Sequence, residues 1–152
     1  MGAAYFYHLT QQPLEHTLPI LLGKARQAGW SVLVRGREAE RMNWLDERLW
    51  LGADDGFLAH GLEGEAHDAA QPILLSSGTG IGNGAACVMS VDGADVETSE
   101  VNDLDRVCIL FDGNDPDAVQ RARGQWKTLT TAGCSAQYWS EESGRWEKKA
   151  EA

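Results

Sequence analysis

Residues 106–117, RVCILFDGNDPD, join an almost wholly apolar run to the start of a helix. The run 106–111 suits a strand that is buried on both faces, as the central strands of parallel sheets are. Asp115 is a favourable helix N-cap, and Pro116 fits the first helical position because the N–H it lacks would have no partner there. The stretch therefore predicts a strand–turn–helix unit, the repeating element of parallel α/β folds.

The same alternation extends to both sides of this unit. Apolar or alternating runs predict further strands at 4–9, 30–35, 72–76, 86–91 and 134–140. The order β-α-β-α-β-β-β-α-β predicts one α/β domain over residues 1–152, with a mostly parallel twisted sheet and helices on both faces. Residues 141–152 form a charged C-terminal tail, with a short last strand around 145–147.

Three long helices are expected between these strands. One covers 38–50, and another runs from Pro116 to about Thr131. The first helix ends at Gly29 and begins at Leu14 or, because Pro19 is poorly tolerated in a helix interior, nearer Thr17.

Composition limits the classes of function. The chain has 152 residues and a formal net charge of -10, which argues against non-specific nucleic-acid binding over a broad face but permits a small basic patch. Cys87, Cys108 and Cys134 are widely spaced and are expected to be buried thiols in a reducing compartment. Neither a signal peptide nor an apolar stretch of about 20 residues is found, so we expect a soluble, cytoplasmic protein.

The glycine-rich stretch 77–84, SGTGIGNG, is close to two nucleotide-binding signatures. A dinucleotide motif needs a helix after its glycines, but Ala85 stands in the third glycine's place and 86–91 is expected to be a strand. A P-loop would also need a lysine that is missing here. We therefore expect a hairpin loop; the alternative is a nucleotide-dependent enzyme that uses Gly78–Gly84 as its phosphate loop. No pattern predicts a catalytic residue, a metal site or a cofactor.

The second predicted helix carries aromatic residues beside its core face. Met42, Leu45 and Leu49 have the spacing of that face, and Trp50 lies one residue away from it. Trp50 and Phe57 are therefore either partly exposed partner-binding residues or additional core, and the pattern leaves both open.

The third predicted helix combines cations with an aromatic side chain. Val119, Arg123, Trp126 and Lys127 recur at i, i+4, i+7 and i+8 and share one face, with Arg121 on the neighbouring stripe. Such a face suits a short acidic peptide that ends in a hydrophobic residue. The alternative is a solvated helix face with an arginine whose stem covers apolar surface.

Three segments resemble a known family. Residues 44–50 (WLDERLW), 57–62 (FLAHGL) and 72–75 (PILL) are similar to the LDExLW…F…PH…L…P-[VI] run of DNA polymerase III chi subunits. The resemblance implies a Rossmann-like fold without phosphate-binding machinery. It also implies a non-catalytic accessory subunit of the polymerase III holoenzyme, with little or no direct DNA binding. One face would bind a psi-like clamp-loader subunit, and another would hold the acidic C-terminal tail of single-stranded DNA-binding protein, which ends in phenylalanine.

The resemblance assigns roles to individual residues. The tail pocket falls on Arg123, Trp126 and Lys127, with Trp126 where the family often has tyrosine. Val119 stands where the family has a further basic residue, and Arg121 is the expected substitute for that charge.

The psi-like interface falls on Trp50 and Phe57. An adaptor for a repair helicase that uses this same face is the other alternative.

Overall fold

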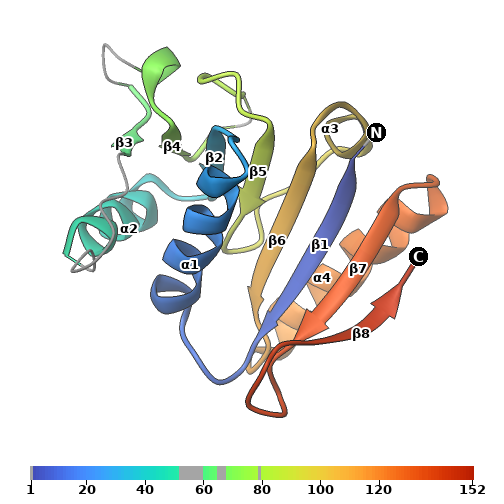
Figure 1. Cartoon of the computed structure of the whole chain (residues 1–152). Coiled ribbons are helices and arrows are strands. Elements are labelled where there is room, and N and C mark those ends of the chain that lie inside the picture. Colours follow the sequence, from blue (N-terminus) through green and yellow to red (C-terminus); the bar gives the residue numbers. More distant parts are fainter. Residues whose placement is uncertain (1, 52–59, 65–67, 79) are drawn as a thin grey trace.

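The computed structural model describes residues 2–51, 60–64, 68–78 and 80–152 (Figure 1). Its elements in chain order are β1 (Ala3–Leu9), α1 (Leu14–Gln27), β2 (Val32–Arg35), α2 (Ala39–Leu51), β3 (Gly61–Leu62), the 3-10 turn η1 (Asp68–Ala70), β4 (Ile73–Ser76), β5 (Cys87–Ser90), α3 (Thr98–Asp103), β6 (Arg106–Asp112), α4 (Pro116–Thr131), β7 (Ser135–Ser140) and β8 (Glu147–Glu151). The predicted strands and long helices are all present. Elements β3, η1 and α3 were not predicted from the sequence, and the last strand, β8, lies slightly later in the chain than predicted.

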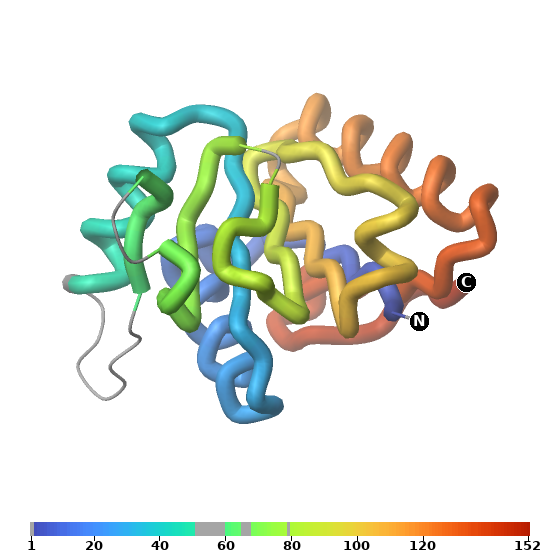
Figure 2. Tube along the Cα trace, turned by 90° about the horizontal axis from the view of Figure 1, so that it is seen from above, coloured from blue at the N-terminus to red at the C-terminus, as the bar shows by residue number. Residues whose placement is uncertain are grey.

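All the strands belong to one sheet, in the order β3-β4-β2-β5-β6-β1-β7-β8. Every neighbouring pair is parallel except β7 and β8, which are antiparallel. Helices α1 and α2 cover one face, and α3 and α4 cover the other (Figure 1). The predicted α/β fold with helices on both faces is confirmed. Seen from above, α2 and α4 lie at opposite ends of the molecule (Figure 2).

Each sheet face has its own hydrophobic core. On the first face, Leu18, Leu22 and Leu45 of α1 and α2 are fully buried against the strands. On the other face, Ala122 and Leu129 of α4 pack against β1, β6 and β7. The strands β2, β4 and β5 are buried along their whole length, which explains their nearly continuous apolar sequences.

The three cysteines are free and buried, as predicted. A hydrogen bond with Cys87, reinforced by burial, raises the pKa of the Cys108 thiol well above its ordinary value. A buried thiol that stays protonated is a poor nucleophile, so Cys108 is a structural member of the core.

Helix α1 contains a proline that sequence analysis expected to shorten it. The helix begins at Leu14, and Pro19 lies inside it. The carbonyl of Pro13 accepts hydrogen bonds from the N–H groups of His16 and Thr17, so the first turn closes before the proline. Burial of Leu18 beside the proline then stabilises a helix that loses one backbone hydrogen bond. The expected start near Thr17 is wrong.

The glycine-rich stretch is not a hairpin loop. Strands β4 and β5 lie on either side of β2 and are both parallel to it, so the segment between them is a crossover. Gly82 and Ala85 lie over Leu74 and Val88, and these apolar contacts cover the sheet there in place of a helix. The buried Asn83 amide anchors the crossover by donating to two backbone carbonyls. The expected hairpin is wrong because two apolar runs joined by a short loop do not reveal the strand inserted between them.

Among the described residues, no helix is both long and apolar enough to cross a membrane.

Candidate functional site

A pocket of about 560 Å³ lies between α4 and the β1–β7–β8 side of the sheet. Its walls come from β1, α4, β7 and β8 and consist of His8, Arg123, Trp126, Tyr138, Ser140, Glu142, Lys149 and Ala150. The pocket therefore joins the N-terminal strand to the C-terminal hairpin, two segments that are far apart in the sequence.

Aromatic rings form the apolar part of this pocket. The Trp126 ring meets Phe6 edge-on, with centroids 5.3 Å apart, and meets Tyr138 at 6.0 Å in a similar orientation. Phe6 is fully buried, whereas Trp126 and Tyr138 are only partly buried. The buried ring supports the other two from below, so their free surfaces present a rigid apolar lining.

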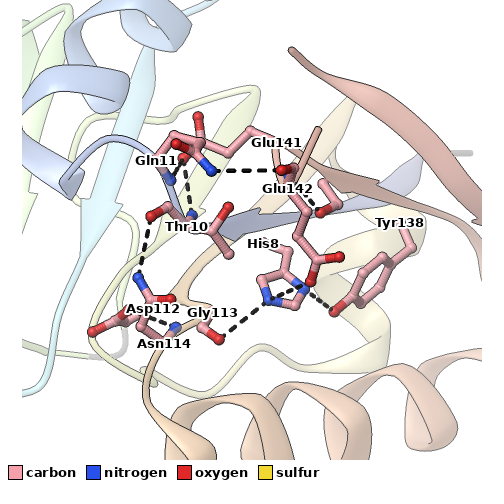
Figure 3. Close-up of polar contacts among 10 residues, drawn as sticks. His8, Thr10, Gln11, Asp112, Gly113, Asn114, Tyr138, Glu141 and Glu142 are labelled. Carbon is pink, nitrogen blue, oxygen red and sulfur yellow. Dashed lines mark hydrogen bonds and ion pairs between the residues drawn. The ribbon is translucent and has the colours of Figure 1, made fainter. Parts of the chain in front are cut away.

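His8 fixes the polar edge of Tyr138 (Figure 3). The Tyr138 hydroxyl lies 2.8 Å from His8 Nδ1, and His8 Nε2 lies 3.4 Å from the carbonyl oxygen of Gly113. Because a carbonyl oxygen only accepts hydrogen bonds, a neutral His8 donates from Nε2 and accepts the tyrosine O–H at Nδ1. Both rings are thereby oriented before any ligand arrives.

The charges of the pocket lie around the tyrosine. Burial raises the pKa of Tyr138, the positive charge of Arg123 opposes that shift, and the carboxylate of Glu142 adds to it. Lys149 supplies a second cation and is bound to Glu147 through a 3.2 Å ion pair. The pocket thus has two cations against one carboxylate in a chain of net charge -10.

The predicted residues of the third long helix do not all meet in this pocket. Arg123 and Trp126 line it. Val119 packs in the core between α4 and the sheet, and Lys127 is exposed on α4 beyond Trp126. Arg121 faces a different cleft.

That second cleft, of about 1010 Å³, lies at the carboxyl ends of β1 and β6. The side chains of Arg121 and Arg37 both lie close to Gly93 in this cleft. Arg41 forms an ion pair with Asp92, with Nε and Oδ2 2.9 Å apart. This is the place where open α/β sheets commonly bind ligands.

The anion-binding position beside that cleft is filled by the chain itself. The backbone N–H groups of Thr10, Gln11 and Gln12 each donate to Glu141 Oε1 at 3.0 Å. Figure 3 shows the contacts of Thr10 and Gln11. Glu141 is 5% exposed. Because its carboxylate binds the first βα turn, it fills the place where nucleotide-binding folds hold a phosphate.

The glycine-rich crossover offers no substitute site. Its described residues 80–84 lead into strand β5 and not into a helix, so no helix N-terminus is directed at a phosphate there. Within the described parts of the chain, no three His, Cys, Asp or Glu side chains are grouped as ligands for a metal ion.

The aromatic residue predicted to bind a partner on α2 is exposed. Trp50 has 47% of its surface accessible, whereas Met42, Leu45 and Leu49 are buried, as their spacing predicted. The Trp50 ring lies on the ring of His60, with centroids 4.2 Å apart, and His60 Nε2 lies 3.2 Å from Asp46 Oδ1.

Phe57, the other residue predicted for this surface, lies outside the described residues.

Six residues that line the pocket were not predicted from the sequence: His8, Tyr138, Ser140, Glu142, Lys149 and Ala150. The alternation of β1 and β7 could have placed His8 and Tyr138 on one face of the sheet. The contribution of Lys149 had no signal, because it depends on how the C-terminal segment folds back.

A comparison with protein families identifies the family of the chain. The family model of the DNA polymerase III chi subunit, HolC, matches residues 1–137. The chain belongs to the chi family. The expected family is confirmed, and with it a role as an accessory subunit in replication. No individually curated protein matches the chain closely enough to be counted as a relative.

Proposed function

We propose that this chi-family chain is a non-catalytic tether of the polymerase III holoenzyme. Its pocket on α4 binds the acidic C-terminal tail of single-stranded DNA-binding protein, and its Trp50 surface joins the clamp loader through a psi-like partner. The chain would thereby hold the replication machinery on coated single-stranded DNA without touching the DNA itself.

One observation carries the assignment of the tail pocket. Arg123 and Trp126, which the family resemblance assigns to tail binding, lie in the same pocket together with Tyr138. The pocket has room for one aromatic side chain and a few backbone atoms. The terminal phenylalanine would rest on the Trp126 and Tyr138 rings, and Arg123 would bind its carboxylate.

The net charge of the protein favours a short anionic ligand over a long polyanion. At net charge -10, a long polyanion is repelled by most of the surface. A short acidic tail meets mainly the two cations of the pocket. Weak binding is sufficient, because many tails on one coated strand raise the effective concentration.

A peptide titration tests this proposal. A labelled acidic peptide ending in Asp-Ile-Pro-Phe is titrated with the protein at low and moderate salt, and binding is followed by fluorescence anisotropy. We expect saturable binding that weakens with salt. Arg123→Ala and Trp126→Ala should each weaken it at least tenfold, about 1.4 kcal/mol.

Arg121→Ala is the matched control. It removes the same charge from the same helix, but Arg121 faces the other cleft. Affinity close to wild type is expected for this variant. Equal losses in the Arg121 and Arg123 variants, or no binding by folded wild type, would overturn the pocket assignment.

The clamp-loader surface rests on the exposure of Trp50. A large aromatic side chain held on a buried histidine beside a helix end is typical of an interface anchor. In size-exclusion chromatography with the organism's clamp-loader proteins, Trp50→Ala should abolish co-elution. Ile20→Ala, which trims the exposed hydrophobic side chain on the neighbouring α1, should leave it intact.

The same surface would serve a repair-helicase adaptor, the alternative partner for Trp50. Co-elution with the helicase but not with the clamp loader would favour that alternative. A nucleotide-dependent activity has no comparable support, because the turn suited to phosphate is filled by Glu141.

A further inference from the structure

The C-terminal hairpin forms one wall of the pocket. Residues beyond 137 lie outside the part of the chain that matches the chi family, yet Glu142, Lys149 and Ala150 line the pocket beside Arg123. This segment is not a loose tail: β8 pairs with β7 along its length, and the backbone of Ala152 exchanges two hydrogen bonds with Ala136.

Two further contacts hold the hairpin against the body of the protein. At its start, the buried carboxylate of Glu141 binds the three N–H groups of the β1–α1 turn. At its turn, Trp146 meets Tyr7 of β1 edge-on, with centroids 5.5 Å apart. One contact is on each side of Glu142, so the hairpin is fixed where it enters the pocket.

A bulge in the hairpin directs Lys149 toward the pocket. Tyr138 pairs with Ala150 and Trp139 pairs with Lys148, so the register passes over Lys149. In a regular strand, Lys149 and Ala150 would point to opposite faces of the sheet. The extra residue of a bulge breaks that alternation, and both residues line the same pocket as a result.

We infer that Lys149 is a ligand-binding residue of the pocket and supplies a second cation for an acidic peptide. This inference rests on the proposed tail binding and deepens it. Arg123 lines the pocket from α4 and Lys149 lines it from β8, so a terminal carboxylate and a preceding acidic side chain can each meet a separate cation.

The present partner of Lys149 does not oppose this role. Lys149 pairs with Glu147 on the surface, with both side chains substantially exposed. Such pairs contribute little free energy because water screens them. A peptide carboxylate can therefore displace Glu147 at small cost.

Neighbouring lysines on β8 provide a matched test. Lys148 and Lys149 are both exposed and each pairs with a glutamate, but only Lys149 lines the pocket. The Asp-Ile-Pro-Phe peptide is titrated with wild type, Lys149→Ala, Lys148→Ala and Lys149→Arg at about 0.15 M salt, where charges beyond about 8 Å are screened. Arg123→Ala is included to report on the tail pocket itself.

We expect Lys149→Ala to weaken binding about three- to fivefold and Lys148→Ala to change it by less than about 1.5-fold. Lys149→Arg should restore the affinity, and the Lys149→Ala effect should shrink as salt rises. If Arg123→Ala loses binding while Lys149→Ala matches Lys148→Ala, the role of Lys149 is wrong and the tail pocket stands. If wild type does not bind, both proposals are wrong.

Discussion

At the scale of single residues, Glu141 is the side chain that joins the two ends of the chain. Glu141 directly follows β7, and its carboxylate accepts hydrogen bonds from three backbone N–H groups in the turn after β1. Those donors lie in the turn before α1, which begins at Leu14. One side chain thus closes an anion site and fixes the hairpin that bears Lys149.

Replacing Glu141 with alanine should destabilise the protein. The change leaves three backbone donors without their acceptor, so we expect the free energy of unfolding to fall by about 2–3 kcal/mol. Urea unfolding followed by circular dichroism measures this. Glu142→Ala removes an exposed carboxylate next door and should change the value by less than about 0.5 kcal/mol. Similar losses in the two variants would contradict the anchoring role of Glu141.

The charges of Arg123 and Glu142 shift the pKa of Tyr138 in opposite directions. Arg123 lowers the pKa of the Tyr138 phenol, and Glu142 raises it. Arg123→Ala should therefore raise that pKa, and Glu142→Ala should lower it. A pH titration of ¹³C-labelled tyrosine rings by NMR reads both shifts. A pKa that moves in neither variant would show that these side chains do not face the tyrosine in solution.

Residue-level prediction from the sequence worked where local spacing decides the outcome. The spacing of Met42, Leu45 and Leu49 identified the buried side of α2. It left open whether Trp50 is core or exposed, and the structure shows Trp50 to be exposed. Prediction failed for Lys149, whose direction depends on a bulge formed with a strand ten residues earlier.

At the scale of elements, the short helix α3 is tied to the sheet by an ion pair between the buried Arg35 and the partly buried Glu100. Arg35, at the end of β2, donates from Nη1 and Nη2 to the two carboxylate oxygens of Glu100, at 2.8 and 2.7 Å. Burial alone would raise the pKa of Glu100. The hydrogen bonds from Arg35 and from the Glu97 backbone, with the charge of Arg35, outweigh burial and lower that pKa.

This ion pair predicts a pH dependence of stability. A carboxyl whose pKa is lower in the folded state stabilises the protein above its unfolded pKa of about 4.3, and this contribution is lost as pH falls through the folded value. Glu100→Gln should cost about 3 kcal/mol at pH 7, and its difference from wild type should shrink below about pH 4. Thermal unfolding across pH checks this, with Asp103→Asn, an exposed change at the end of α3, as the control. A difference that stays constant with pH would contradict the account.

Element-level prediction was limited by topology. Apolar runs located the buried strands, because a strand covered on both faces consists almost entirely of apolar residues. The sequence did not reveal that β2 lies between β4 and β5, nor that a glycine-rich crossover would cover the sheet there. Strand order depends on non-local pairing, which local patterns do not encode.

At the scale of the whole molecule, the two proposed binding surfaces are well separated. Helix α2, which carries Trp50, lies near the β3 end of the sheet, and α4 lies toward the β8 end (Figures 1 and 2). The α4 pocket takes further lining residues from β7 and β8 at that end. A rigid sheet between two such surfaces allows both partners to bind at once, as a tether requires.

This separation predicts that the two surfaces act independently. Distant sites without shared partners have additive effects. Trp50→Ala should therefore leave peptide affinity unchanged, and Arg123→Ala should leave co-elution with the clamp loader unchanged. The double variant should lose peptide affinity as much as Arg123→Ala does and lose co-elution as Trp50→Ala does. A loss of peptide binding in folded Trp50→Ala would contradict the independence of the surfaces.

The central claim is the location of the peptide, and NMR mapping tests it most directly. The ¹⁵N-labelled protein is titrated with the unlabelled Asp-Ile-Pro-Phe peptide. We predict that the Trp126 indole signal and the backbone signals of His8, Arg123 and Lys149 shift together and saturate, while the Trp50 indole signal stays in place. Shifts centred instead on Arg37, Arg41 and Arg121 would place the peptide in the other cleft and contradict the account.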